Sequence, residues 1–277
     1  HYLAQIQGCG RKWALSVGAT QSSDFEKIKE CHFEKIIVRD YDSLELLKKN
    51  GIDAEYAPDF TFLLKPDREH GKALLDNLFK KHSAEKYENI VVVCLNSYAL
   101  LPNHPRDTMK ESYLQYFLNE MSVILDNTHA SFVFLPFSTQ FPYEDRVINS
   151  MCASRAKFYK KNVCIFDELS PTEALDIIAA SNLVLGQRLH ANIFAAICKT
   201  PFLAISLDNK FESFCKTLGE EPRCFSYENL NFHLFKKKID ESLEYNFEIH
   251  QILKEKYHKQ LKILEDKINI LNNEKIL

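Results

Sequence analysis

The sequence lacks several patterns that define common protein classes. Only seven of its 277 residues are glycine, which argues against collagen-like, linker-rich and low-complexity sequence. No apolar segment approaches the roughly 18 residues that a membrane-spanning helix requires, and no signal peptide is visible. The chain begins with His1 rather than methionine, so we expect a truncated N-terminus and leave open a leader or anchor before it.

Cysteine is not scarce, but its spacing excludes two kinds of site. No two of the eight cysteines are separated by two residues, so neither a zinc ribbon nor a dithiol redox site is indicated. Cys94 and Cys198 lie in apolar runs, where cysteine behaves as a small buried hydrophobic residue. We therefore predict reduced thiols and a cytoplasmic protein.

The chain also lacks an excess of charge of either sign. Its 35 lysines and arginines nearly balance its 38 aspartates and glutamates. The formal net charge of −3 does not indicate a protein that binds a polyanion. A nucleic-acid partner is therefore not expected. The absence of a G-x-S-x-G elbow disfavours a Ser-His-Asp hydrolase, and neither a P-loop nor a G-x-G-x-x-G segment follows a strand. No cluster of ligands indicates a metal site.

What the sequence does contain is an alternation of short apolar runs with amphipathic segments. In the N-terminal part, the predicted strands are residues 12–18, 35–38 and 53–57, with helices between them. Asp42 or Ser43 can cap the second helix, and Gly51 stands where that helix should end. This β-α-β-α-β pattern predicts a parallel sheet that is covered on both faces.

A second α/β unit is predicted after the polar segment 65–88. Its predicted strands are residues 90–95, 131–137, 162–166, 183–185 and 201–206, with helices between them. Ser170 caps one of these helices, with Pro171 at the first helical position. We therefore predict an α/β protein with two Rossmann-like domains facing a cleft: a truncated domain at 1–82, a second at 83–243, and a C-terminal helix at 244–277.

The C-terminal helix carries one apolar stripe. Leu261, Leu264, Ile268 and Leu271 recur at spacings of three and four residues. Over so few turns the stripe can pair with a second copy, giving a homodimer, or pack against its own domain. The sequence leaves both options open.

The most informative stretch is SNLVLGQRLHANIFAA, residues 181–196. A short buried strand ends at Gly186 and Gln187, and an apolar helix follows with Arg188 and His190 at its start. The backbone N–H groups at a helix N-terminus, an arginine fork and an imidazole together suit a phosphate or a carboxylate. The alternative is structural, with Arg188 in a salt bridge and His190 as a hydrogen-bonded core histidine.

Charged residues also follow other predicted strands. Lys210 follows the next strand and should reach the same strand-end crevice, although a solvated surface lysine is the simpler interpretation. Arg39 and Asp40 follow a strand of the first domain, where they can face the cleft or form an ion pair that holds the loop. Ser43 fits a helix cap better than a ligand, and Asp59 is either a turn residue or a binding carboxylate.

His190 is the best candidate for a general acid or base. The unperturbed pKa of histidine, about 6.5, lies close to neutral pH. Asp167 and Glu168 also follow a predicted strand and could orient the hydroxyl groups of a substrate.

Two blocks of the sequence resemble the polysaccharide pyruvyl transferase family. The run PTEALDIIAASNLVLGQRLHANIFAAICKTPFLAIS is similar to its hallmark, in which an R-[LF]-H triplet opens an apolar helix before a K-x-P-[FV] strand. The run IIVRDYDSLELLKKNG resembles its VRD-x-x-S segment. The resemblance covers residues 12–225. The family's glycine-rich G-x-x-N-x-GD opening is not found here, so it was lost with the N-terminus or has diverged.

The resemblance implies a fold like that of the two-domain GT-B glycosyltransferases. It also implies phosphoenolpyruvate as donor, no further cofactor, and a pyruvate ketal on two hydroxyl groups of a sugar as product. The donor side would be the second domain and the acceptor side the first. The acceptor sugar or glycan can be lipid-linked, in which case a membrane surface is a further partner.

By the same resemblance, individual residues receive roles. Arg188 and His190 match the R-x-H pair and would be catalytic and donor-binding. Lys210, Gly186, Gln187 and Arg39 complete the expected donor set. The expected acceptor-binding residues are Asp40, Ser43 and Asp59.

Two rival interpretations remain. A GT-B glycosyltransferase or sugar epimerase would use a nucleotide-sugar, because the same crevice suits a diphosphate. A non-catalytic protein would bind a glycan or a partner protein through its helical C-terminal tail. Similarity of fold alone does not separate these interpretations.

Overall fold

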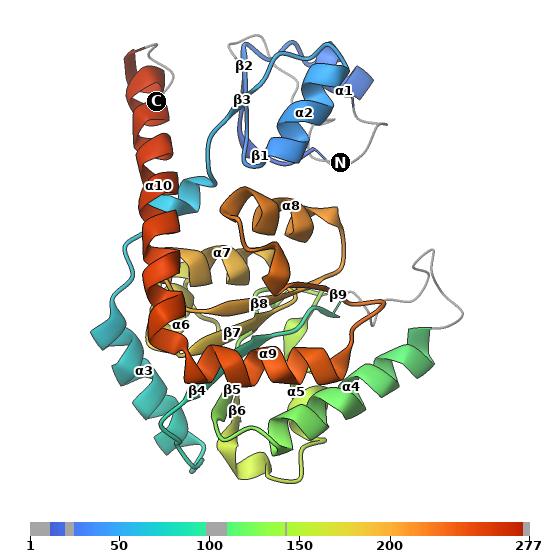
Figure 1. The fold of residues 1–277 in the computed structure, drawn as a ribbon, viewed down its shortest axis with the longest axis vertical. Helices are drawn as coiled ribbons and strands as arrows, with labels where there is room; N and C mark the ends of the chain where they lie inside the picture. Colours follow the sequence, from blue (N-terminus) through green and yellow to red (C-terminus); the bar gives the residue numbers. More distant parts are fainter. Residues whose placement is uncertain (1–11, 20–24, 98–109, 142, 274–277) are drawn as a thin grey trace. The chain divides into compact units, whose positions relative to one another are not determined.

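The computed structural model describes residues 12–19, 25–97, 110–141 and 143–273 (Figure 1). The chain divides into two compact units. The first comprises His1–Leu63, Asp208–Glu221 and Lys256–Leu277, and the second comprises Leu64–Leu207 and Pro222–Glu255.

The second unit is built on a six-stranded parallel sheet. Its strands are β4 (Ile90–Cys94), β5 (Ser131–Phe134), β6 (Asn162–Cys164), β7 (Leu183–Gly186), β8 (Phe202–Ser206) and β9 (Cys224–Ser226). They lie in the order β6-β5-β4-β7-β8-β9, which is the strand order of Rossmann-type sheets. The chain builds outward from β4 to β6, then returns to place β7 beside β4. The strand order therefore reverses between β4 and β7, and the crevice beyond the strand ends at such a point is where α/β sheets bind ligands.

Helices cover both faces of this sheet (Figure 1). On one face lie α4 (Lys110–Asp126), α5 (Asp145–Ala153) and α9 (Phe232–Glu244), which share one apolar cluster with the strands. On the other lie α6 (Pro171–Ala179) and α7 (Leu189–Cys198). Because both faces are covered, the inner strands β4, β7 and β8 are nearly continuous apolar runs, and each is buried along its whole length. The buried thiols of Cys94 and Cys198 belong to this interior, and burial raises their pKa values.

Helix α6 begins as the sequence predicts. Ser170 is its N-cap and Pro171 its first residue. The Ser170 hydroxyl accepts a hydrogen bond from the Glu173 N–H at 3.2 Å, and the Ser170 N–H donates to the Glu173 carboxylate at 2.8 Å. This capping box satisfies donors at the N-terminus that the helix itself leaves unpaired.

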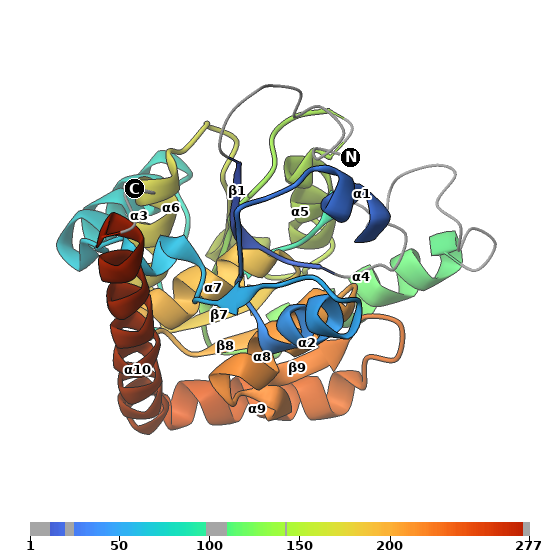
Figure 2. The same ribbon diagram turned by 90° about the horizontal axis from the view of Figure 1, so that it is seen from above.

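Helix α3 (Arg68–Lys81) packs against α6 in the second unit (Figure 2). A Cβ atom on Gly71 would lie 1.9 Å from the carbonyl oxygen of Asp176, so only glycine permits this close crossing. The Asp176 carboxylate accepts from the Asp67 N–H at 2.7 Å and contacts His70 Nδ1 at 2.8 Å. This division of the chain differs from the predicted boundary after residue 82, because α3 packs with the second unit.

The first unit contains a three-stranded parallel sheet in the order β1-β2-β3. Its elements are β1 (Trp13–Val17), α1 (Phe25–Glu30), β2 (Lys35–Val38), α2 (Tyr41–Lys49), β3 (Glu55–Tyr56) and the 3₁₀ helix η3 (Phe60–Leu63). The unit also includes α8 (Asn209–Leu218) and the C-terminal part of α10 (Asn246–Asn273). The short 3₁₀ helices η5 (Tyr159–Lys161) and η6 (Glu221–Arg223) complete the described elements.

The N-cap of α2 is Asp40, which corrects the prediction of Asp42 or Ser43. The Asp40 carboxylate accepts from the Ser43 N–H at 2.7 Å and from the Ser213 hydroxyl at 2.9 Å. The other end of α2 agrees with the sequence, because Gly51 follows the helix at a φ of +69°, where a residue with a side chain would be strained.

The apolar stripe of the C-terminal helix packs within the same chain. Leu264 and Leu271 are fully buried. On the same stretch of α10, Gln260 accepts a hydrogen bond from the Tyr56 hydroxyl at 2.6 Å, and Lys267 forms an ion pair with Glu55. This is the second of the two options that the sequence left open for the stripe, and a homodimer stays a prediction. Among the described residues, no helix is both long and apolar enough to cross a membrane.

Candidate functional site

The site lies where β4 and β7 end side by side. Gly186 is the last residue of β7, and Gln187 connects the two strands. The Gln187 N–H donates to the Cys94 carbonyl at 2.8 Å, and its side-chain oxygen accepts from the Asn96 N–H at 3.0 Å. Gln187 is almost completely buried. At its predicted place beside the crevice, its hydrogen bonds therefore hold the ends of β4 and β7 together.

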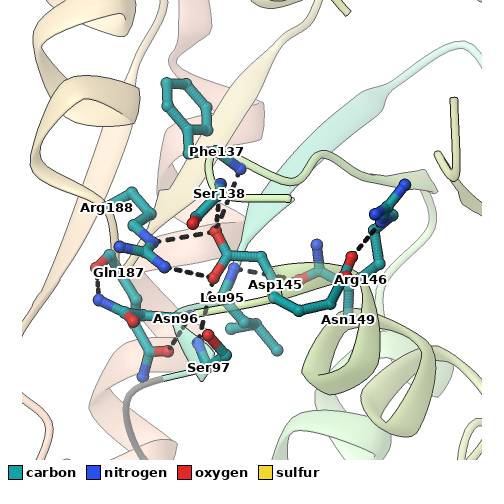
Figure 3. A network of polar contacts seen from close by, with 11 residues as sticks. Leu95, Asn96, Ser97, Phe137, Ser138, Asp145, Arg146, Asn149, Gln187 and Arg188 are labelled. Atoms are coloured by element: carbon teal, nitrogen blue, oxygen red, sulfur yellow. Dashed lines mark hydrogen bonds and ion pairs between the residues drawn. The ribbon is translucent and has the colours of Figure 1, made fainter. Parts of the chain in front are cut away.

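Arg188 forms a two-point ion pair with Asp145 (Figure 3). Its Nε lies 2.9 Å from Asp145 Oδ2 and its Nη2 lies 2.5 Å from Oδ1. The Asp145 side chain is completely buried, whereas 22% of the Arg188 side chain is exposed. Backbone N–H groups of Ser97, Phe137 and Ser138 also donate to the Asp145 carboxylate, at 3.1, 3.1 and 2.9 Å. The carboxylate thus joins the ends of β4, β5 and β7.

The surroundings of Asp145 offset the cost of burying its carboxylate. Burying an ion costs free energy unless charged and hydrogen-bonding partners replace its water. Asp145 has a guanidinium and three N–H donors, and it is the first residue of α5, where the helix dipole favours negative charge. The ion pair of the structural alternative is therefore present. The Arg188 side chain nevertheless remains 22% exposed.

Sequence reasoning missed Asp145. No role was given to it, because only the residues after the other predicted strands were considered. A signal was available, because Asp145 follows β5, whose carboxyl end lies beside that of β4 in the Rossmann order.

The N-terminus of α7 adds a second feature. Arg188 is its N-cap, and within the described residues no side chain caps this helix. His190 is exposed in the first turn, so it is not the buried core histidine of the structural alternative. A helix start without a side-chain cap, next to an exposed imidazole, can attract an anion.

The main chain at this turn is held by Asn192. Its side-chain amide donates to the carbonyl oxygens of Gly186 and Arg188, both at 3.1 Å. A Cβ atom on Gly186 would lie 2.5 Å from Asn192 Oδ1. Glycine is therefore required at the end of β7 for the strand to pass this buried amide.

Residues 11–209 match the model of the family described as polysaccharide pyruvyl transferase, which is more than half of the chain. The chain belongs to the polysaccharide pyruvyl transferase family. This membership places the protein among transferases. The matched segment contains Arg39, Asp145, Arg188 and His190, while Lys210 lies just beyond its end.

Solved glycosyltransferases share the fold of this family member. A glycosyltransferase from Rickettsia africae matches with a TM-score of 0.58 and 11% identity, over 94% of this chain and 70% of that chain. An α,α-trehalose-phosphate synthase (UDP-forming) from Burkholderia xenovorans matches with a TM-score of 0.58 and 10% identity, over 95% and 68% of the two chains. At this identity the likeness shows the fold alone, and the predicted GT-B-type α/β fold with its C-terminal helix is confirmed.

The remaining predicted residues of this pyruvyl transferase family member belong to the first unit. Arg39 Nη1 lies 3.2 Å from Asp59 Oδ2, so the Arg–Asp pair considered for the loop exists with Asp59 as partner. Asp40 is the buried cap of α2. Ser43 is buried as well, and its hydroxyl accepts from the Ala19 N–H at 2.8 Å.

Lys210 lies in the first turn of α8, which packs with the first unit. Its Nζ is 2.9 Å from the carboxylate of Asp208, the N-cap of α8, and its side chain is 41% exposed. Asp167 forms an exposed ion pair with Lys81 at 2.6 Å, which lowers the pKa of that carboxyl. The structure thus gathers Gly186, Gln187, Arg188 and His190 around one strand-end turn of the second unit, whereas Arg39, Asp40, Ser43, Asp59 and Lys210 belong to the first unit.

Proposed function

We propose that this transferase moves a pyruvyl group from phosphoenolpyruvate to a sugar of a glycan or glycolipid precursor. The product is a pyruvate ketal, and phosphate is released. The observation that carries this proposal is the turn after β7, where a partly exposed Arg188 and an exposed His190 begin α7 at the switch point of the sheet. Family membership supports the same reaction.

The chemistry of the donor suits this turn. Phosphoenolpyruvate carries a phosphate and a carboxylate, and both bind well to guanidinium groups and to helix N-termini. The pair with Asp145 occupies Nε and one N–H of Nη2, while the second N–H of Nη2 and the two N–H groups of Nη1 lie on the other edges of the planar guanidinium. These N–H groups are the part of Arg188 proposed to bind the donor.

The proposed reaction proceeds by addition and elimination. A proton adds to the methylene carbon of phosphoenolpyruvate, and one sugar hydroxyl adds to the resulting cationic carbon and loses its own proton. The C–O bond to phosphate then breaks, and a second hydroxyl closes the ketal with loss of a proton. His190 transfers the proton either to the methylene carbon or to the leaving phosphate. Donor roles for Lys210 and Arg39, and acceptor roles for Asp40, Ser43 and Asp59, stay predictions.

The first experiment is a ligand-binding comparison by thermal shift and calorimetry. Phosphoenolpyruvate is tested against uridine and guanosine diphosphates, with wild type, Arg188→Ala and Arg155→Ala. Arg155 is a matched control, because it is half-buried near the opposite end of α5 and bonds to Met151 and Gln115. A ligand at 100 times its Kd should stabilise the native state by about 2.7 kcal/mol.

The outcomes separate the proposal from its rivals. Stabilisation by phosphoenolpyruvate that is lost in Arg188→Ala and kept in Arg155→Ala supports pyruvyl transfer. Stabilisation by a nucleotide diphosphate alone would replace it with glycosyl transfer. Phosphate release is then measured with a panel of free and lipid-linked sugars. If no acceptor gives release and no donor binds, the protein is not a pyruvyl transferase.

A further inference from the structure

Asp145 is a buried ion that the proposed reaction does not yet use. None of its side chain is exposed, so it cannot contact a ligand in the crevice directly. Five donors converge on its carboxylate: two from Arg188 and one each from three backbone N–H groups. An influence of Asp145 on a bound ligand therefore has to pass through Arg188.

The geometry of the pair fixes the plane of the guanidinium. The two oxygens of Asp145 contact Nε and Nη2, two nitrogens on one edge of Arg188 (Figure 3). A single contact would allow the group to rotate about the bond, whereas two parallel contacts do not. The remaining N–H groups then point in a fixed direction, away from the carboxylate.

The carboxylate itself is held as firmly as the guanidinium. Its partners Ser97, Phe137 and Ser138 follow β4 and β5, and Asp145 starts α5. Asn192 separately fixes the main chain at Arg188. Only the side-chain torsions of Arg188 are therefore left free to vary, and the ion pair with Asp145 restricts them.

We propose that Asp145 is a positioning residue that orients Arg188 toward the anionic groups of the donor. This inference rests on the proposed function. Asp145 makes no contact with the donor and changes no bond. Its effect is to present the donor with an arginine whose direction is set before binding, which lowers the ordering cost of binding.

The first test measures KM and kcat for phosphoenolpyruvate in Asp145→Asn. The amide cannot replace a carboxylate that accepts five hydrogen bonds, so Arg188 loses its fixed direction. We expect KM to rise about 10- to 100-fold, the size of a lost charged hydrogen bond. The control is Asp176→Asn, which makes the same change at another buried carboxylate of the second unit. Its KM should equal that of wild type.

A double-mutant cycle distinguishes positioning from a structural role. If Asp145 acts through Arg188, Asp145→Asn should have no further effect on KM in an Arg188→Ala background. A purely structural role would lower thermal stability in both backgrounds and leave the donor KM of the folded protein unchanged.

A second measurement avoids any change at Asp145. Guanidinium and methylammonium ions are added to Arg188→Ala, and phosphate release is followed. The carboxylate left behind should orient a planar guanidinium through two contacts, so guanidinium should restore activity and methylammonium should not. Arg188→Lys should likewise behave like Arg188→Ala, because a point charge cannot be oriented in this way.

The outcomes separate the two proposals. A folded Asp145→Asn with an unchanged KM, or equal rescue by both cations, would overturn the role of Asp145 while pyruvyl transfer stands. A wild-type protein that neither binds phosphoenolpyruvate nor releases phosphate from it removes the proposed function, and the role of Asp145 falls with it.

Discussion

Two Arg–Asp pairs in the described part of the chain follow parallel strands in similar positions but differ in geometry. In the second unit, Arg188 contacts both oxygens of Asp145, which is fully buried and accepts three backbone N–H groups. In the first unit, Arg39 contacts Asp59 through Nη1 at 3.2 Å. Asp59 also accepts from the N–H and the hydroxyl of Thr61, at 3.0 and 2.8 Å.

The difference teaches what each pair can do. Two-point contact with a rigidly held carboxylate orients Arg188, which suits recognition of an anion. The contact of Arg39 connects the end of β2 to the turn that begins η3, which suits a loop that has to be held in place. The same two residue types after a strand thus suit the proposed anion binding in one unit and loop anchoring in the other.

The largest expected effect is a fall in kcat when His190, which lies in the same turn as Arg188, is replaced. His190→Gln should lower kcat for phosphate release by about 10²–10⁴-fold, because a general acid or base is lost. Thermal stability should hardly change, since His190 is exposed. His70→Gln, at a histidine on α3 of the same unit, is the control. A loss of only a few-fold would remove His190 from proton transfer.

The next expected effect compares the two aspartates by their free energies of unfolding. Asp145→Ala should cost about 3–5 kcal/mol, because it leaves a half-buried arginine and backbone donors without their acceptor. Asp59→Ala should cost about 1–2 kcal/mol, the value of ordinary hydrogen bonds. Urea denaturation of both variants measures the difference. Equal losses would mean that the two pairs are equivalent and that the comparison fails.

A smaller effect is expected from the glycines beside the two pairs. A Cβ atom on Gly186 would lie 2.5 Å from Asn192 Oδ1, whereas on Gly18 it would lie 3.6 Å from Asp40 Oδ2. Gly186→Ala should therefore cost about 1–3 kcal/mol through overpacking and should also raise the donor KM. Gly18→Ala should stay within about 0.5 kcal/mol of wild type. Calorimetric melting of the two variants gives the result, and the reverse order would contradict the geometry.

The smallest expected effect is a pH dependence confined to the first unit. The hydrogen bond from Lys216 holds the pKa of Asp42 below its ordinary value of 3.8, although partial burial opposes this shift. The folded state therefore binds its proton less readily than the unfolded state. The stabilisation is complete above about pH 3.8 and is lost as the pH falls through the lowered pKa.

The melting temperature between about pH 5 and pH 3 tests this dependence, with Lys216→Met as the comparison. In that variant the acid-induced loss should be smaller than in wild type. Identical profiles for the two proteins would show that Lys216 does not influence the titration of Asp42.

The sequence was sufficient for features whose causes are local. The capping box of α6 needs only Ser170 and Glu173, three residues apart, and the strands needed only short apolar runs. The predicted N-cap of α2 was wrong, because several neighbouring polar side chains can take the capping position. Asp40 is the cap, and it also accepts a hydrogen bond from Ser213, which lies 173 residues further along the chain.

The candidate site was predicted only in part for the same physical reason. Arg188 and His190 were visible, because a strand, a turn and a helix follow one another in a single stretch. Asp145 lies 43 residues before Arg188 in the sequence. The two residues meet because β5 and β7 lie on either side of β4 in the sheet. Propensity and periodicity do not contain that information. It follows from the order of the strands.

The glycine at the crossing of α3 and α6 has a consequence for recombining this protein with its relatives. Gly71 and the Asp176 carbonyl fit together with no room for a methyl group, so the two helices form a matched set. A hybrid joined after Leu63 keeps that set from one parent. A hybrid joined after Lys81 takes its α3 from the other parent, and a side chain opposite Asp176 would push the helices apart. The junction of a hybrid protein should therefore be placed before α3.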